Sequence, residues 1–120
     1  MEVHESEEMY LETILRLKMQ QPTVRSVDIV ETLDYAKSSV SRGVNLLKER
    51  GYITVGSGGE IELTESGKNK AEEVFERHKV ITQAFIKMGA SRDVAEDNAC
   101  RIEHVITKDL FEIIKEYFSD

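Results

Sequence analysis

The chain has 120 residues, of which 40% are hydrophobic and 32% charged, which suits a soluble protein with one core or two small subdomains and excludes a disordered chain. The formal net charge of −7 excludes indiscriminate binding to nucleic acid, although a local basic surface can still bind DNA. Short apolar runs, an acidic start and a single cysteine, Cys100, predict a cytoplasmic protein with no membrane partner and no intrachain disulfide.

An amphipathic helix is predicted from about His4 to Gln20, because apolar residues recur at helical spacing and Pro22 follows the end of the run. A short helix should come next and end near Leu33, with Ser26 as its N-cap residue. Its apolar side is predicted to consist of Val27, Ile29, Val30 and Leu33. These two segments therefore predict a helical start to the fold.

A third helix is predicted to begin near Lys37 or Ser38, with Gly51 as the C′ residue that follows it. This segment is a basic island on an acidic protein. It holds the basic residues Lys37, Arg42, Lys48 and Arg50 and a single acid, Glu49. The acid surplus lies elsewhere, chiefly before residue 13 and from residue 60 onward.

Two alternating runs, residues 52–55 and 60–63, flank the glycine-rich sequence Gly56-Ser57-Gly58-Gly59 and predict a β-hairpin. A hairpin directly after a helical pair is the order of a winged helix-turn-helix, which binds double-stranded DNA. The simpler alternative is a helical hairpin whose polar outer face is only solvated.

The exposed side of the third helix carries residue types that suit DNA. Small hydroxyl groups at its start allow close approach, and the backbone N–H groups there attract phosphate. Arg42 and Asn45 suit bidentate contacts with bases, whereas Lys37 and Lys48 suit phosphates. The candidate DNA-binding residues are Lys37, Ser38, Ser39, Ser41, Arg42, Asn45, Lys48 and, at the hairpin tip, Ser57.

Three helices are predicted after the hairpin. Thr64 should cap a long helix to Met88, Ser91 a helix to about Ile106, and Thr107 the last helix. The predicted fold is therefore mainly α, with a winged helix-turn-helix DNA-binding domain over residues 1–64 and a helical dimerisation domain over residues 65–120. The last helices are apolar enough for a second copy of the chain to cover them.

A metal-binding pattern lies in the second half of the chain. Cys100, Glu103 and His104 are spaced i, i+3 and i+4, so on one helix their side chains would share a face. Thiolate, carboxylate and imidazole are competent ligands for a first-row divalent metal. Candidates for a further ligand from another element are Met9, Glu12 and His78. The alternative is structural: a lone cysteine is commonly a small buried hydrophobe, and a Glu-His pair is commonly solvated.

The sequence resembles the diphtheria toxin repressor family of iron- and manganese-dependent regulators. The matching stretches are Glu8-Met9-Tyr10-Leu11-Glu12-Thr13-Ile14, Ser38-Ser39-Val40-Ser41, Leu63-Thr64-Glu65-Ser66-Gly67, Arg77-His78 and Ala99-Cys100-Arg101-Ile102-Glu103-His104-Val105. The resemblance implies metal-activated repression by a dimer and a primary metal site formed by Met9, Cys100, Glu103 and His104. It also places His78 in a second, ancillary site, where Glu96 occupies the position of a histidine ligand of the iron-type members.

Three features depart from the iron-type pattern. Glu12 matches a manganese-type ligand at a position where iron-type members carry a basic residue. Thr82 stands where they place an ancillary carboxylate, which puts full binding at the ancillary site in doubt. The SH3-like third domain of the longer members is not expected here.

The function expected from these features is metal-dependent repression of metal-homeostasis genes. Because thiolate and thioether are soft ligands, Fe²⁺ is preferred over Mn²⁺ as the co-repressor, while Co²⁺, Ni²⁺ or Zn²⁺ should bind in vitro. One alternative is a winged-helix regulator without metal gating, and another is a protein-interaction module that uses the last helix. A third is a metalloenzyme with Glu103 as base, although no glycine-rich phosphate loop and no paired nucleophile and base are found in the sequence, so no enzyme is expected.

Overall fold

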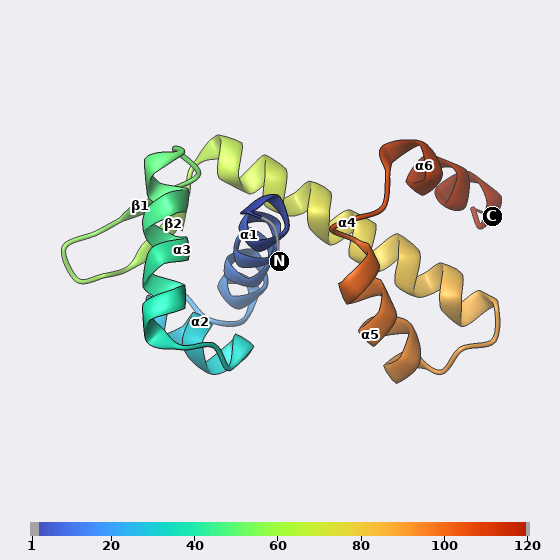
Figure 1. Cartoon of the computed structure of the whole chain (residues 1–120), viewed down its shortest axis with the longest axis horizontal. Helices are drawn as coiled ribbons and strands as arrows, with labels where there is room; N and C mark the ends of the chain where they lie inside the picture. The colour runs from blue at the N-terminus through green and yellow to red at the C-terminus, as the bar shows by residue number, and fades with distance from the viewer. Residues whose placement is uncertain (1–2, 120) are drawn as a thin grey trace. The chain divides into compact units, whose positions relative to one another are not determined.

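The structure is a computed structural model that describes residues 3–119 (Figure 1). Its elements, in chain order, are α1 (Val3–Gln20), α2 (Ser26–Leu33), α3 (Lys37–Glu49), β1 (Ile53–Val55), β2 (Ile61–Leu63), α4 (Glu65–Lys87), α5 (Arg92–Ile102) and α6 (Lys108–Tyr117). The predicted mainly helical fold with a two-stranded wing is confirmed. No helix within residues 3–119 is long and apolar enough to cross a membrane.

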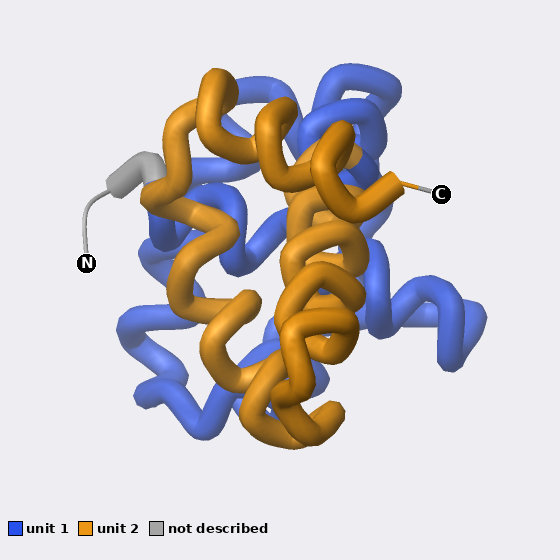
Figure 2. Tube along the Cα trace, turned by 90° about the vertical axis from the view of Figure 1, so that its right-hand side faces the viewer, with its two compact units in different colours: residues 1–72 blue, residues 73–120 orange. Residues whose placement is uncertain are grey.

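The chain divides into two compact units, residues 1–72 and 73–120, which are coloured separately in Figure 2. The division falls inside α4, whereas the sequence predicts a domain boundary after Thr64. The first turns of α4 belong with the first unit because Lys70 donates to the carboxylate of Glu7 (3.2 Å) and to the hydroxyl of Tyr52 (3.4 Å). The two units are described separately below.

The core of the first unit is built by α1, α2, α3 and the inner face of the wing. Its fully or almost fully buried aliphatic side chains include Leu11, Ile14, Ile29, Val40, Leu47, Ile53 and Ile61. Burial of each such side chain contributes about 1.5–3 kcal/mol. The prediction that Val27 lies on the buried side of α2 is wrong, because its side chain is 51% exposed. The buried side of this short helix is centred on Ile29.

The wing is a two-stranded antiparallel sheet with Ile53 opposite Leu63 and Val55 opposite Ile61. These four side chains share one face, since alternate residues of a strand point to the same side. The Ile61 N–H donates to the carbonyl of Val24 (2.7 Å), so the segment before α2 holds the wing.

The predicted N-caps Thr64, Ser91 and Thr107 are confirmed, with side-chain oxygens that accept from backbone N–H groups at 3.2, 3.3 and 3.3 Å. Ser26 is not the N-cap of α2; that residue is Arg25. Instead, the side chain of Asp28, in the first turn of the helix, accepts a hydrogen bond from the backbone N–H of Arg25 (2.8 Å). Gly51 has a φ of 80° and follows α3 as predicted.

The second unit contains the rest of α4 with α5 and α6, around a small core of Ile81, Ala99 and Phe111. The prediction that α5 continues to about Ile106 is wrong, because α5 ends at Ile102. The Val105 N–H donates to the Ile102 carbonyl (3.0 Å), an i→i+3 bond that tightens the turn after the helix.

The close contact between Gly67 and the wing predicts a strong effect of an added methyl group. A Cβ atom at Gly67 would lie 1.9 Å from the backbone oxygen of Tyr52, so Gly67→Ala must displace the wing or α4. We expect the free energy of unfolding to fall by about 1–3 kcal/mol. Urea unfolding followed by circular dichroism measures this, with the neighbouring exposed variant Lys68→Ala as the control; equal midpoints for the two variants would contradict the prediction.

Candidate functional site

A buried carboxylate between two imidazoles is the central feature of the second unit. Glu103 is 0% exposed, and His78 and His104 are also buried. One oxygen of Glu103 lies 2.9 Å from Nδ1 of His78, and the other lies 3.3 Å from Nε2 of His104. Burial of a carboxylate is costly unless hydrogen bonds or opposite charges compensate it. The two imidazoles are therefore partners that make burial of Glu103 tolerable.

The chain positions these three side chains from two segments. His78 lies on α4, where its ring stacks on that of Phe75 with centroids 6.5 Å apart. The Glu103 N–H donates to the carbonyl of Ala99 (2.9 Å) at the end of α5, so Glu103 and His104 lie in the turn directly after this helix. From the sequence, His78 is one of three candidates for a further metal ligand. In the structure, its ring contacts the carboxylate of Glu103.

Three other positions singled out in the second unit differ in burial. Cys100 is exposed on α5. Glu96 is half-exposed and pairs with Arg92, one turn away on the same helix (3.5 Å). Thr82, one turn after His78, is buried and supplies a hydroxyl rather than a carboxylate. The structure therefore brings Glu103 into contact with His78 and with His104, while Glu96 pairs with Arg92.

The first unit contributes two candidate ligands from α1. Met9 is half-buried and Glu12 is buried, and a spacing of three residues puts them on the same side of the helix. Glu12 lies 3.7 Å from the guanidinium of Arg16. The thioether sulfur of Met9 accepts a hydrogen bond from the hydroxyl of Tyr35 (3.5 Å).

The donor chemistry of these groups fits a divalent first-row transition metal. Two imidazoles and a carboxylate are suitable ligands for Mn²⁺, Fe²⁺ or Zn²⁺, and a thioether adds a softer donor. The 2.9 Å contact between His78 and Glu103 is a hydrogen bond, so His78 orients this carboxylate, while the other oxygen of Glu103 lies beside Nε2 of His104 (3.3 Å).

The predicted DNA-binding residues form a largely exposed surface on α3 and the wing. The exposed members are Lys37, Ser38, Ser41, Arg42, Asn45, Lys48 and Ser57. Ser39 is half-buried, and its hydroxyl accepts from the guanidinium of Arg42 (3.4 Å). The tip of the wing is fixed by Arg25, whose Nε donates to the carbonyl of Gly58 (3.0 Å).

One residue of the predicted basic island, Arg50, belongs to a cluster of ion pairs in the first unit. Arg50 donates to the buried carboxylate of Glu7 (2.9 Å), which also accepts from Lys70 (3.2 Å). Burial alone would lower the pKa of Lys70, but its hydrogen bonds to Glu7 and Tyr52 outweigh this and raise the pKa above its usual value. No sequence spacing predicts this cluster, because its members are 43 and 63 residues apart. Arg50 therefore holds α3 to α1 in addition to carrying charge.

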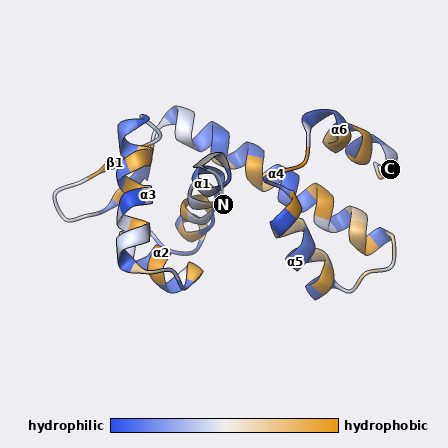
Figure 3. Cartoon of the chain, viewed as in Figure 1, coloured by the Kyte–Doolittle hydropathy of each residue, from blue (hydrophilic) through white to orange (hydrophobic). Residues whose placement is uncertain are grey.

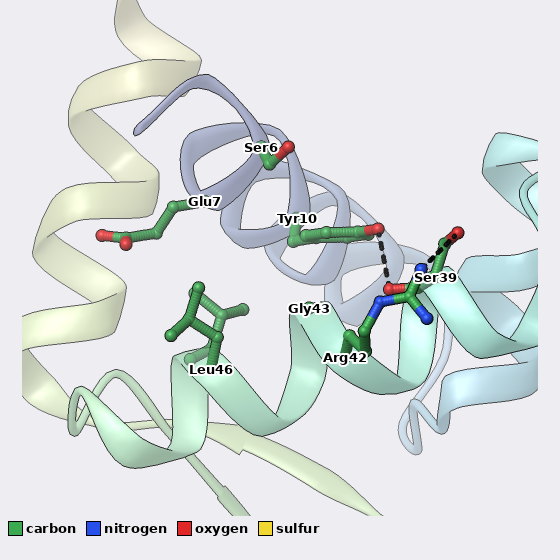
Figure 4. A pocket seen from close by; sticks show the side chains of 8 residues that line it. Ser6, Glu7, Tyr10, Ser39, Arg42, Gly43 and Leu46 are labelled. Atoms are coloured by element: carbon green, nitrogen blue, oxygen red, sulfur yellow. Dashed lines mark hydrogen bonds between the residues drawn. The ribbon is translucent and has the colours of Figure 1, made fainter. Parts of the chain in front are cut away.

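A cavity of about 310 Å³ adjoins this cluster, between α1 and α3 (Figure 4). Glu7 and Tyr10 line it from α1, and Ser39, Arg42 and Gly43 from α3. Burial and the neighbouring Tyr35 raise the pKa of Tyr10, against a smaller lowering by Arg42. Its hydroxyl donates to the carbonyl of Ser39 (3.4 Å).

Comparison with known proteins covers both halves of the chain. Residues 2–57 match the family model for the iron-dependent repressor N-terminal DNA-binding domain, and residues 64–120 match that for the iron-dependent repressor metal-binding and dimerisation domain. The chain is 31% identical over 110 residues to the iron-dependent repressor IdeR of Mycobacterium tuberculosis, covering 91% of the chain and 48% of that protein. It is 29% identical over 104 residues to the diphtheria toxin repressor of Corynebacterium diphtheriae, covering 86% of the chain and 46% of that protein.

The chain thus spans about half the length of these two relatives. Among solved structures, a manganese-dependent transcriptional repressor in complex with manganese superposes with a TM-score of 0.84 at 24% identity, over 92% of this chain and 51% of that one. At this identity the superposition supports the fold alone. The two consecutive domain matches, together with the winged helix-turn-helix and the helical second unit, show that the chain belongs to the iron-dependent repressor family, which includes the diphtheria toxin repressor.

Proposed function

We propose that the chain is a transcriptional repressor of metal-homeostasis genes that binds double-stranded operator DNA as a homodimer, with a divalent transition metal as co-repressor. The observation that carries this proposal is the buried Glu103 carboxylate between His78 and His104, in a chain whose first half matches a DNA-binding domain. Imidazoles and a carboxylate are ligands that a divalent transition metal accepts.

The proposed DNA contacts come from α3 and the wing. Arg42 and Asn45 are exposed on α3 and have the donor and acceptor groups for bidentate contacts with base edges in the major groove. Lys37 and Lys48 are assigned to phosphates, together with the small hydroxyls at the helix start. Ser57 is assigned to the sugar-phosphate backbone beside the wing.

The proposed homodimer is supported by the large apolar side chains that the second unit exposes; Figure 3 shows hydrophobic residues interspersed along α4, α5 and α6. The exposed side chains are Met88 (70% exposed), Val94 (55%), Val105 (60%), Leu110 (49%), Ile113 (61%) and Tyr117 (80%). Exposed apolar groups gathered on one small unit are typical of an interface. A dimer would also set the distance between two α3 helices, which must match half-sites roughly 34–36 Å apart per turn of DNA.

The proposed ligand set is the one expected from the sequence, with Met9 and Glu12 from the first unit and Cys100, Glu103 and His104 from the second. His78 and Glu96 stay the proposed residues of a second, ancillary site, and the hydrogen bond from the His78 ring to Glu103 would also orient a ligand of the primary site. A bound cation supplies positive charge among these carboxylates. Ligands from both units would restrict the distance between the DNA-binding helices of a dimer, and this restriction is our proposed basis for co-repression.

The choice of metal follows from ligand softness. Fe²⁺ is proposed as the co-repressor ahead of Mn²⁺, because Cys100 and Met9 offer thiolate and thioether donors. Replacing both by harder ligands, in the double variant Met9→Asp/Cys100→Glu, should shift the preference from Fe²⁺ toward Mn²⁺. Anaerobic competition titration measures the affinity ratio for the two ions, with Met19→Asp as a control at an exposed methionine; an unchanged ratio in the double variant would refute the softness argument.

The test of the proposed function measures DNA binding with and without metal. A duplex selected by the wild-type protein from a random library in the presence of Mn²⁺ serves as the probe, and affinity is measured before and after a chelator. We expect chelation to weaken binding about 5- to 150-fold, the range of common allosteric couplings. Full retention of DNA binding in the chelator and in His104→Ala would favour the alternative, a winged-helix regulator without metal gating.

A further inference from the structure

Two consecutive residues of α1 make hydrogen bonds to the segment that leads into α3. The hydroxyl of Tyr35, in the turn between α2 and α3, donates to the sulfur of Met9 (3.5 Å). The hydroxyl of Tyr10 donates to the backbone carbonyl of Ser39 (3.4 Å), in the first turn of α3. Both bonds lie within the first unit, and both connect α1 to the start of the proposed DNA-reading helix.

The two tyrosine rings are themselves in contact. Their centroids are 6.4 Å apart and their planes are nearly perpendicular, at 88°, the edge-to-face arrangement that aromatic pairs prefer. Tyr10 is 6% exposed, whereas Tyr35 is 36% exposed. A Cβ atom at position 43 would lie 2.3 Å from the Tyr10 ring, so the absence of a side chain at Gly43 lets this ring lie directly against α3. Figure 4 shows the Tyr10 ring beside Gly43 of α3.

The bond to Met9 matters because a free methionine side chain is a poor ligand. Its three rotatable bonds sample many rotamers, and ordering such a side chain costs up to about 1.5–2 kcal/mol. A donor that holds the sulfur removes part of this cost before a metal binds. A hydrogen bond uses one lone pair of the thioether, and the second remains for a cation.

We propose that Tyr35 is a positioning residue that orients the Met9 thioether for metal binding, and that Tyr35 and Tyr10 together connect this ligand to the start of α3. The inference rests on the proposed metal-dependent function and adds residues to which neither the family resemblance nor the ligand spacing assigns a role. Groups that orient a metal ligand commonly contribute about 10- to 100-fold to metal affinity. Since a thioether is a weak acceptor, an effect near the lower end, about 10-fold, is expected.

The experiment uses the full chain and begins without metal. The four methionines are labelled with ¹³C at the terminal methyl group, and the Met9 resonance is assigned by its loss in Met9→Leu. Tyr35→Phe keeps the ring and removes only the hydroxyl, so the Met9 methyl resonance should move. Tyr117→Phe, at a tyrosine that is 80% exposed, is the matched control and should leave it in place.

The second arm titrates the same variants with Co²⁺, whose visible absorption reports ligation. Tyr35→Phe should weaken Co²⁺ binding about 10-fold, and it should cause no further loss in a Met9→Leu background, because the two residues act as one unit. Tyr10→Phe should keep the Co²⁺ affinity but reduce the ratio between metal-bound and metal-free DNA affinity.

The outcomes separate this inference from the function on which it rests. If Tyr35→Phe leaves both the Met9 resonance and the Co²⁺ affinity unchanged while Met9→Leu weakens Co²⁺ binding, the positioning role is refuted and the metal function stands. Independent, additive losses from Tyr35→Phe and Met9→Leu would refute the positioning role in the same way. If the wild-type chain does not bind Co²⁺, Mn²⁺ or Fe²⁺, the proposed function itself fails, and the inference fails with it.

Discussion

The variant Glu103→Gln should lose metal binding and, with it, the metal-dependent gain in DNA affinity, which we place at about 5- to 150-fold. Glu103 contacts both imidazoles, at 2.9 Å from His78 and 3.3 Å from His104. An amide of the same shape keeps the side-chain volume but removes the negative charge that a cation requires. Affinity for the selected duplex, measured with and without Mn²⁺, should become the same in both conditions.

The control for this variant is Asp97→Asn, the same carboxylate-to-amide change at an exposed residue that pairs with Arg101 on its own helix (3.3 Å). It should keep the wild-type response to Mn²⁺. Thermal unfolding of both variants without metal checks that a loss of response does not come from a loss of fold. A folded Glu103→Gln that still gains DNA affinity with Mn²⁺ would remove Glu103 from the ligand set.

The fold was predictable because its signals are local. Apolar residues at helical spacing, N-cap hydroxyls at Ser91 and Thr107 and the glycine-rich tip between β1 and β2 each act within a few residues of themselves. The predicted helix ends were wrong where a second local interaction was also possible. Ser26 can cap a helix, but the acid at Asp28 reaches back to the N–H of Arg25. The apolar run after Ile102 continues at helical spacing, yet the chain turns there.

The candidate site was predictable only in part. Spacing places Glu103 and His104 together, but the contact that completes their cluster comes from His78, 25 residues away. The bonds from Arg50 to Glu7 and from Tyr35 to Met9 join residues 43 and 26 positions apart. No periodicity or motif relates such pairs, because their contacts depend on how α1 packs against the helix-turn-helix. Sequence therefore predicts which residue types can act as ligands, and tertiary packing decides which groups orient them.

The second large effect is expected on α3, where Arg42→Ala should weaken binding to the selected duplex by about 1–3 kcal/mol and relax base preference at one position. Arg42 is exposed, and its guanidinium donates to the hydroxyl of Ser39 (3.4 Å), which leaves the other N–H groups of its planar fork for a base. Arg42→Lys keeps the charge but loses that fork. If Arg42 contacts a base, the lysine variant should lose base preference nearly as fully as the alanine variant.

Lys48→Ala provides the contrast, because a lysine assigned to a phosphate should act through charge alone. Its loss should weaken binding to all sequences alike and reduce the slope of log affinity against log salt concentration by about 1. Lys108→Ala, an exposed lysine of the second unit, should change neither base preference nor slope. Selection from a random library and salt titrations distinguish these cases. If Arg42→Lys keeps full base preference while Arg42→Ala only lowers the salt slope, Arg42 contacts phosphate, and sequence recognition by α3 must come from Asn45 or from the shape of the DNA.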